Sequence, residues 1–221
     1  MKVAFISQPH GGKVGDLLTS LIQDATAGKY NEVVFLTAFA KRAGVARLKT
    51  ALSSLKSSSS SLTAIVGVDH NGTSKEAIAD LVQLSDKLFI VHSTRPDVTF
   101  HPKAYLFKGA TSARLLIGSS NLTAGGLFTN MELSVELEYD LPADGPALAA
   151  ATAWLPTLSD PAQPFVNEVT AQNLGAMLAC LPSEASIAAA TTTAASSPNS
   201  SQSASGLSSL FGAGSFPTAP A

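Results

Sequence analysis

The sequence has few features of a secreted or membrane protein. One cysteine among 221 residues, Cys180, excludes an intrachain disulfide and fits a reducing compartment. No uncharged apolar run reaches the ~18 residues that a membrane span needs. The apolar stretch at the N-terminus is too short for a signal peptide and is typical of a first strand. We therefore expect a cytoplasmic protein with no membrane partner.

Basic residues are missing from the second half of the chain. All 14 lysines and arginines lie at or before Arg114, together with eight acidic residues, which gives that part a formal charge of +6. Eight acidic residues and no basic ones follow, so the remainder carries −8. A polyanion is attracted to surfaces built by the first part. Taken alone, this asymmetry is more typical of an ordinary surface charge pattern.

Charge of either sign is missing after residue 184. The segment 185–221 consists mainly of Ser, Thr, Ala, Pro and Gly. Such a composition buries too little apolar surface to offset the entropy of ordering, which predicts a disordered tail or linker. Its end, 206–216, is either a short docking segment or plain linker.

Clusters of metal ligands are missing as well, so we expect no metal and no cofactor. Residues 11–16, Gly-Gly-Lys-Val-Gly-Asp, do not have the spacing of a phosphate-binding loop and indicate a loop before a helix. Isolated histidines are usually packed or surface residues, which is the expectation for His10, His70 and His92. Cys180 and Trp154 are most simply core residues.

What the sequence does contain is an alternation of strand and helix patterns, which predicts an α/β domain over residues 1–142. A hairpin-like run after the alternating part indicates a mixed β-sheet flanked by helices. A helical extension over 143–184 follows, in two segments, 147–158 and 169–181. The expected strands are 3–7, 32–39, 62–68, 87–92, 103–107, 114–117 and 133–139. The expected helices of the first domain are 17–25, 45–55 and 74–84.

The most informative residues lie within 32 positions of each other. His101 and Lys103 are two apart in a predicted strand, so their side chains point to the same face. A second strand ends at Gly118-Ser119-Ser120-Asn121, where a turn can bring Ser119 and Asn121 beside the first pair. Glu132 follows after 11 residues. A histidine, an ammonium, a hydroxyl, an amide and a carboxylate together indicate a phosphate site with a nucleophile in it.

This arrangement resembles the active-site motif of the phospholipase D superfamily, in which His-x-Lys precedes Gly-Ser-x-Asn and a Glu. The resemblance is closest to the single-motif branch, which contains small nucleases and catalytic domains of restriction endonucleases. It extends over about residues 1–140 and includes the strand-like 62–68, the stretch 69–77 and Phe100. Two departures exist. Lys108 stands where the longer family pattern has an Asp, and the interval from Lys103 to Gly118 is about three residues longer. Both fall at the predicted hairpin 108–112, where insertions cost little.

The resemblance implies metal-independent hydrolysis of a phosphodiester. His101 would be the nucleophile and form a phosphohistidine, and Lys103 and Asn121 would bind the non-bridging oxygens. Ser119 would support the site, and Glu132 would orient the imidazole. Because the chain has a single His-x-Lys, the histidine that acts as general acid would come from a second copy. The implied protein is a homodimeric nuclease, with DNA more expected than RNA as its substrate.

Two alternatives remain open at this stage. A lipid phosphodiesterase would share the motif, although no membrane-binding amphipathic helix or lipid anchor is evident in the sequence. An auxiliary, non-catalytic DNA-binding module of a helicase or restriction system would share the charge pattern. The presence of all five motif residues favours a catalytic site over that module. No base-reading element is identifiable, so sequence specificity would come from an additional DNA-recognition or helicase partner.

Overall fold

A single eight-stranded sheet is the centre of the molecule in this computed structural model, which describes residues 1–95, 97–194 and 210–211. The strand order is β1-β7-β6-β5-β2-β3-β4-β8. Strands β2, β3 and β4 are parallel, whereas all other neighbouring pairs are antiparallel. The predicted mixed sheet is therefore confirmed. The strands are β1 (Lys2–Gln8), β2 (Glu32–Thr37), β3 (Ser61–Gly67), β4 (Lys87–Val91), β5 (Lys103–Lys108), β6 (Ser112–Gly118), β7 (Glu132–Asp140) and β8 (Val166–Glu168).

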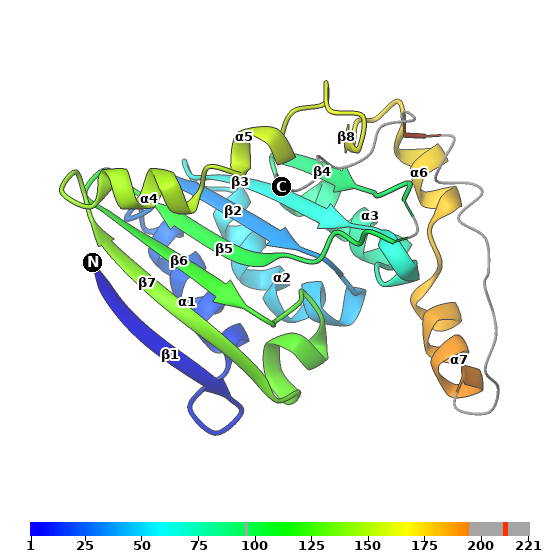
Figure 1. The fold of residues 1–221 in the computed structure, drawn as a ribbon, viewed down its shortest axis with the longest axis horizontal. Coiled ribbons are helices and arrows are strands. Elements are labelled where there is room, and N and C mark those ends of the chain that lie inside the picture. The colour runs from blue at the N-terminus through cyan, green and yellow to red at the C-terminus, as the bar shows by residue number, and fades with distance from the viewer. Residues whose placement is uncertain (96, 195–209, 212–221) are drawn as a thin grey trace.

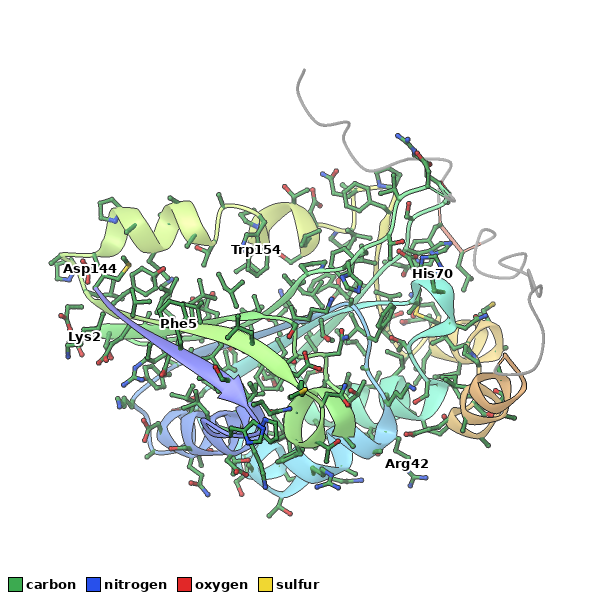
Figure 2. All side chains as sticks on the ribbon, turned by 60° about the horizontal axis from the view of Figure 1, so that its bottom comes forward. Lys2, Phe5, Arg42, His70, Asp144 and Trp154 are labelled. Atoms are coloured by element: carbon green, nitrogen blue, oxygen red, sulfur yellow. The ribbon has the colours of Figure 1, made fainter. Side chains whose placement is uncertain are left out.

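Helices cover both faces of this sheet, as the predicted α/β class requires. One face carries α1 (Val14–Thr26), α2 (Arg42–Lys56) and α3 (Lys75–Leu84), whereas α4 (Gly145–Ala151) and α5 (Leu155–Leu158) lie on the other. Figure 2 shows the two helical layers above and below the strands. Shorter elements are η1 (Asp69–Asn71), η2 (Gly125–Thr129), α6 (Leu174–Cys180) and α7 (Glu184–Ala194).

Alternation along the strands divides the apolar side chains between two cores. In β2, Val33 and Phe35 pack into the core beneath α1 and α2, while Val34 and Leu36 pack into the core on the opposite face. Successive side chains of a strand point to opposite faces, so a central strand covered on both sides is apolar at nearly every position. Strand β2 is buried over its last five residues for this reason.

The chain after residue 142 differs from its prediction in detail. The expected helix 147–158 is two helices, α4 and α5, and Pro156 lies at the start of the second. Residues 166–168, outside every predicted element, form the edge strand β8 beside β4. The expected helix 169–181 is confined to α6.

Helix α7 occupies the first part of the predicted disordered tail, which is a correction for residues 185–194. The backbone N–H of Ser186 donates to the Ser183 hydroxyl, a helix-capping bond, and four of the next eight residues are alanine, the strongest helix former. Of the possible docking segment 206–216, only Leu210 and Phe211 are described. The Phe211 ring is buried and lies 5.3 Å from the His92 ring. Residues 195–209 and 212–221 lie outside the described part of the chain.

The strand directions bring the predicted site residues to one end of the sheet. Figure 1 shows the arrowheads of β2, β3 and β6 at the same end, where β5 and β7 begin. At this end α2 lies against the turn that follows β6. A Cβ at Gly44 would come within 2.5 Å of the Leu122 carbonyl oxygen, so only glycine fits there. The carboxyl end of β2 and the β6–η2 turn are thus held together.

Candidate active site

His101 and Lys103 lie side by side at the start of β5, as their spacing predicts. The Lys103 ammonium lies 2.7 Å from Nδ1 and 3.1 Å from Nε2 of His101, and it donates to the His101 carbonyl at 2.7 Å. Lys103 is only 6% exposed, while His101 is open to solvent. No carboxylate forms an ion pair with Lys103 among the described residues. The site therefore contains a buried cation whose partners are the imidazole and the carbonyl oxygen of His101.

This arrangement lowers the pKa of both groups. Desolvation lowers the pKa of His101, and the positive charges of Lys103 and His70 lower it further. Burial also lowers the pKa of Lys103, and the negative charge of Glu132 opposes that shift. A histidine with a lowered pKa stays neutral to a more acidic pH than usual, so His101 retains a nucleophilic lone pair at neutral pH.

Ser119 and Glu132 are brought together at the ends of β6 and β7. The Ser119 hydroxyl donates to a Glu132 carboxylate oxygen in a short hydrogen bond, and it accepts from the Leu133 N–H at 3.2 Å. The other Glu132 oxygen accepts from the Asn130 amide at 3.2 Å. Sequence reasoning predicted Glu132 as a hydrogen-bond partner of the His101 imidazole. In the described structure both of its oxygens are instead directed to Ser119 and Asn130, because β7 begins one strand beyond β6.

Asn121 is held by its carbonyl oxygen at the end of β2. The backbone N–H of Phe39 donates to Asn121 Oδ1 at 3.1 Å, and the Thr37 hydroxyl lies 3.4 Å from the same atom. This contact fixes the orientation of the carboxamide. Its NH₂ group has no hydrogen-bond partner among the described residues, so it remains available to an anion.

Several residues that support the site were not identified from the sequence. The buried Tyr105 hydroxyl donates to the Ser120 carbonyl at 2.9 Å and ties β5 to the turn after β6. Asp69 accepts from the Phe100 N–H at 2.8 Å, from the Ser93 N–H at 3.1 Å and bonds His92 Nδ1 at 2.7 Å. Asp69 lies 32 residues before His101, so only the tertiary structure shows that it holds the segment leading to His101.

Three further features of the structure concern possible metal ligands, membrane-spanning helices and Lys108, which stands where the family pattern has an Asp. No group of three or more histidines, cysteines or carboxylates able to hold a metal ion occurs in the described part of the chain. Within the same residues, no helix is long and apolar enough to cross a membrane. Lys108 ends β5 at the far end of the strand from Lys103 and pairs with Glu32 at 3.0 Å. The substitution relative to the family pattern therefore lies outside the cluster around His101.

The contact between Lys103 and His101 predicts a measurable pKa. We expect the His101 imidazole to titrate below the ordinary histidine value of 6.5 in the intact protein. In Lys103→Met the repulsion from the ammonium is lost, so the pKa of His101 should rise. Histidine ring signals followed by NMR over a pH series measure both values. Lys87→Met is the matched control, because Lys87 is exposed at the start of β4, at the opposite end of the sheet. A His101 pKa at or above 6.5, or one that Lys103→Met leaves unchanged, would contradict this account.

Comparisons with known proteins show the fold through solved structures. No family model matches the chain, and no curated protein matches it. Nuc, a phospholipase D family member from Salmonella typhimurium, is similar with a TM-score of 0.56 at 17% identity, and the match covers 77% of this chain and 99% of Nuc. Phosphatidylserine synthase of Haemophilus influenzae has a TM-score of 0.51 at 11% identity, covering 76% of this chain and 39% of that protein. The chain therefore has the fold of the phospholipase D family.

Proposed function

We propose that the protein is a metal-independent phosphodiesterase that hydrolyses nucleic acid, DNA in particular, through a phosphohistidine intermediate. The observation that carries the proposal is the buried Lys103 ammonium, which forms no ion pair with a carboxylate of the described residues and lies against the imidazole of His101. A buried cation without a counter-ion is costly, and a bound anion relieves that cost. An anion with an electrophilic centre, such as a phosphodiester, would then lie beside the nucleophile.

The arrangement gives each residue a distinct role. The Lys103 ammonium and the free NH₂ group of Asn121 bind the non-bridging phosphate oxygens. His101 attacks phosphorus, because its lowered pKa keeps the ring neutral. When the anion binds, the ammonium turns from the ring toward the stronger acceptor and frees a ring nitrogen. Ser119 and Glu132 act as a hydrogen-bonded pair that borders the site on the β7 side.

The reaction has two balanced steps. The two His101 rings of the dimer hold different protonation states in this step, the attacking ring neutral and the partner's ring an imidazolium. A ring nitrogen of His101 forms a P–N bond while the P–O bond to the leaving group breaks, and the leaving oxygen takes the proton from the partner's His101. Water then attacks phosphorus, the P–N bond breaks, and the proton of the water passes to the partner's His101. His101 ends as it began, and no metal takes part in either step.

The charges at the site end of the sheet favour a polyanionic substrate. Lys13 and Lys41 immediately precede α1 and α2, at the end where β1 and β2 finish. Neither forms an ion pair with a carboxylate among the described residues, so both remain available to phosphates. A role in restriction or defence, with a separate DNA-recognition or helicase partner, belongs to the same proposal.

A second copy of the chain is the proposed source of the general acid. One sheet face carries an exposed apolar patch, which is not covered by α4 and α5. The apolar patch consists of Val3, Phe5, Ile117 and Leu133. The strand registers place these four side chains on the same face, where Phe5 is 72% exposed and Leu133 is 59% exposed. It adjoins the site, because the Leu133 N–H donates to the Ser119 hydroxyl.

Burying this patch in a two-fold dimer would bring two His101 side chains toward one phosphate. Figure 2 labels Phe5 on β1, beside β7.

The proposed metal-independent function predicts DNA cleavage in the presence of EDTA. Full-length protein should hydrolyse a radiolabelled DNA strand with the chelator present, because the proposed chemistry requires no metal. His101→Ala should reduce kcat by about 10³-fold or more, since the nucleophile is removed. Lys87→Ala, far from the site, serves as the control. Loss of all activity on chelation, restored by a divalent ion, would contradict the proposal. Cleavage of phospholipid vesicles but not of DNA would assign the site to a lipid instead.

A site shared by two chains predicts that a dimer of one wild-type and one His101→Ala chain does not cleave DNA. Chains of wild type and His101→Ala carrying different affinity tags are co-expressed, and heterodimers are isolated on both tags in sequence. They should be almost inactive, because the one remaining histidine has no partner to protonate the leaving group. A doubly tagged wild-type dimer is the control. A heterodimer with about half the wild-type rate would show that each chain holds a complete site.

A further inference from the structure

His70 is a second histidine at the site end of the sheet, and the chemistry described above does not use it. It lies in η1, the short turn after β3, and its side chain is exposed. Figure 2 labels it at one end of the sheet, apart from Phe5. Sequence reasoning predicted an ordinary packed or surface residue, which left this histidine without a role.

The backbone at His70 is held in a conformation that side chains disfavour. His70 and Asn71 both have φ of 55°, in the left-handed region. Residues other than glycine are uncommon there, although His and Asn tolerate the region better than most, and such conformations concentrate where ligands bind. Two in succession imply that the surrounding contacts fix the turn. The ring of Phe39 provides one of them, since it packs directly against Gly72, where a Cβ would come within 2.1 Å of it.

Contacts on both sides of His70 tie it to the segment that carries His101. His70 Nε2 lies 2.6 Å from the Thr99 hydroxyl, and Thr99 is two residues before His101. The adjacent Asp69 accepts from the Phe100 N–H at 2.8 Å. The Phe39 ring that packs on Gly72 also meets the His101 ring edge to face, with centroids 5.7 Å apart. One contact of His70 itself and two contacts of its neighbours, Asp69 and Gly72, thus tie this turn to the segment that carries the nucleophile.

The position of His70 suits a group beside the reacting phosphate. No hydrogen bond joins His70 to His101 in the described structure, but the Thr99 hydroxyl that His70 Nε2 contacts lies two residues before His101. The contacts to the scissile phosphate are already supplied by Lys103 and Asn121. The Thr99 hydroxyl contacts Nε2 of His70. The other ring nitrogen, Nδ1, has no hydrogen-bond partner among the described residues and is available to an external acceptor.

We propose that His70 is a substrate-binding residue whose ring contacts the phosphate next to the scissile one on the bound strand. The proposal rests on the proposed nuclease function and specifies its substrate as a strand with consecutive phosphodiesters. A nucleic acid offers such a neighbouring phosphate, whereas a compound with one isolated phosphodiester does not. His70 would thus favour polynucleotides over small phosphodiesters.

The test compares two thymidine substrates that differ by one phosphate. TpT has a single phosphodiester, and TpTpT has two. The variant is His70→Asn, because asparagine tolerates the left-handed backbone and lacks the imidazole. We expect kcat/KM on TpTpT to fall about ten-fold or more, as for the loss of a hydrogen bond to a charged group, with a change within about two-fold on TpT. His10→Asn is the matched control, since His10 is another exposed histidine, in the loop after β1. Thermal unfolding compares the stability of all variants.

The two substrates separate binding of the neighbouring phosphate from other roles of His70. An equal loss on both substrates, or no loss on either, would overturn the proposal, because His70 would then act on the scissile phosphate, on folding, or on nothing. Binding of the same two compounds to His101→Ala, with and without His70→Asn, separates this question from catalysis. If wild type hydrolyses neither substrate, the nuclease function fails, whereas weaker binding of TpTpT alone would still identify His70 as a phosphate ligand. Unchanged binding of TpTpT would overturn the proposal for His70 as well.

Discussion

The burial of the Lys103 ammonium against His101 is the interaction on which the whole site depends. A cation placed at the first position of an inner strand loses most of its hydration, and within the described part of the chain it recovers hydrogen bonds from the ring and carbonyl of His101 alone. The pKa of both groups is lowered as a result. In the proposed function, an incoming phosphate would supply negative charge and hydrogen-bond acceptors to this lysine. Affinity for an anion and a neutral nucleophile would then have the same structural cause.

The rest of the fold serves to hold this pair in place. Strand β5 lies between β2 and β6, so each neighbour contributes a loop to the same end of the sheet. The Phe39 N–H fixes Asn121, and the Tyr105 hydroxyl fixes the Ser120 carbonyl. Asp69 links β3 to the segment before His101. These contacts all involve buried or half-buried polar groups, which are costly to leave unpaired and therefore specify one geometry.

Much of the site could be predicted because it depends on local periodicity. The two-residue spacing of His101 and Lys103 predicts their common face, and the Gly118-Ser119 turn after the next strand predicts that Asn121 can come back toward that pair. The partner of Glu132 could not be predicted, because it depends on how β7 begins relative to Ser119 across a strand pair. His70 and Asp69 could not be placed for a similar reason, since their neighbours lie about 30 residues away. Near the C-terminus, composition predicted disorder over residues that form α7, where the helix propensity of alanine and the Ser183 cap determine the outcome.

The most direct test of this account is to trap the covalent intermediate. Full-length protein is mixed with a DNA strand that carries radiolabelled phosphates, denatured within milliseconds to seconds, and separated from free nucleotide under alkaline conditions. The account predicts label bound to the protein that survives base, is released by acid, and maps to the peptide containing His101. His101→Ala should retain none. Rapid cleavage of DNA by wild type without any protein-bound label, or label on a different residue, would contradict the assignment of His101 as the nucleophile.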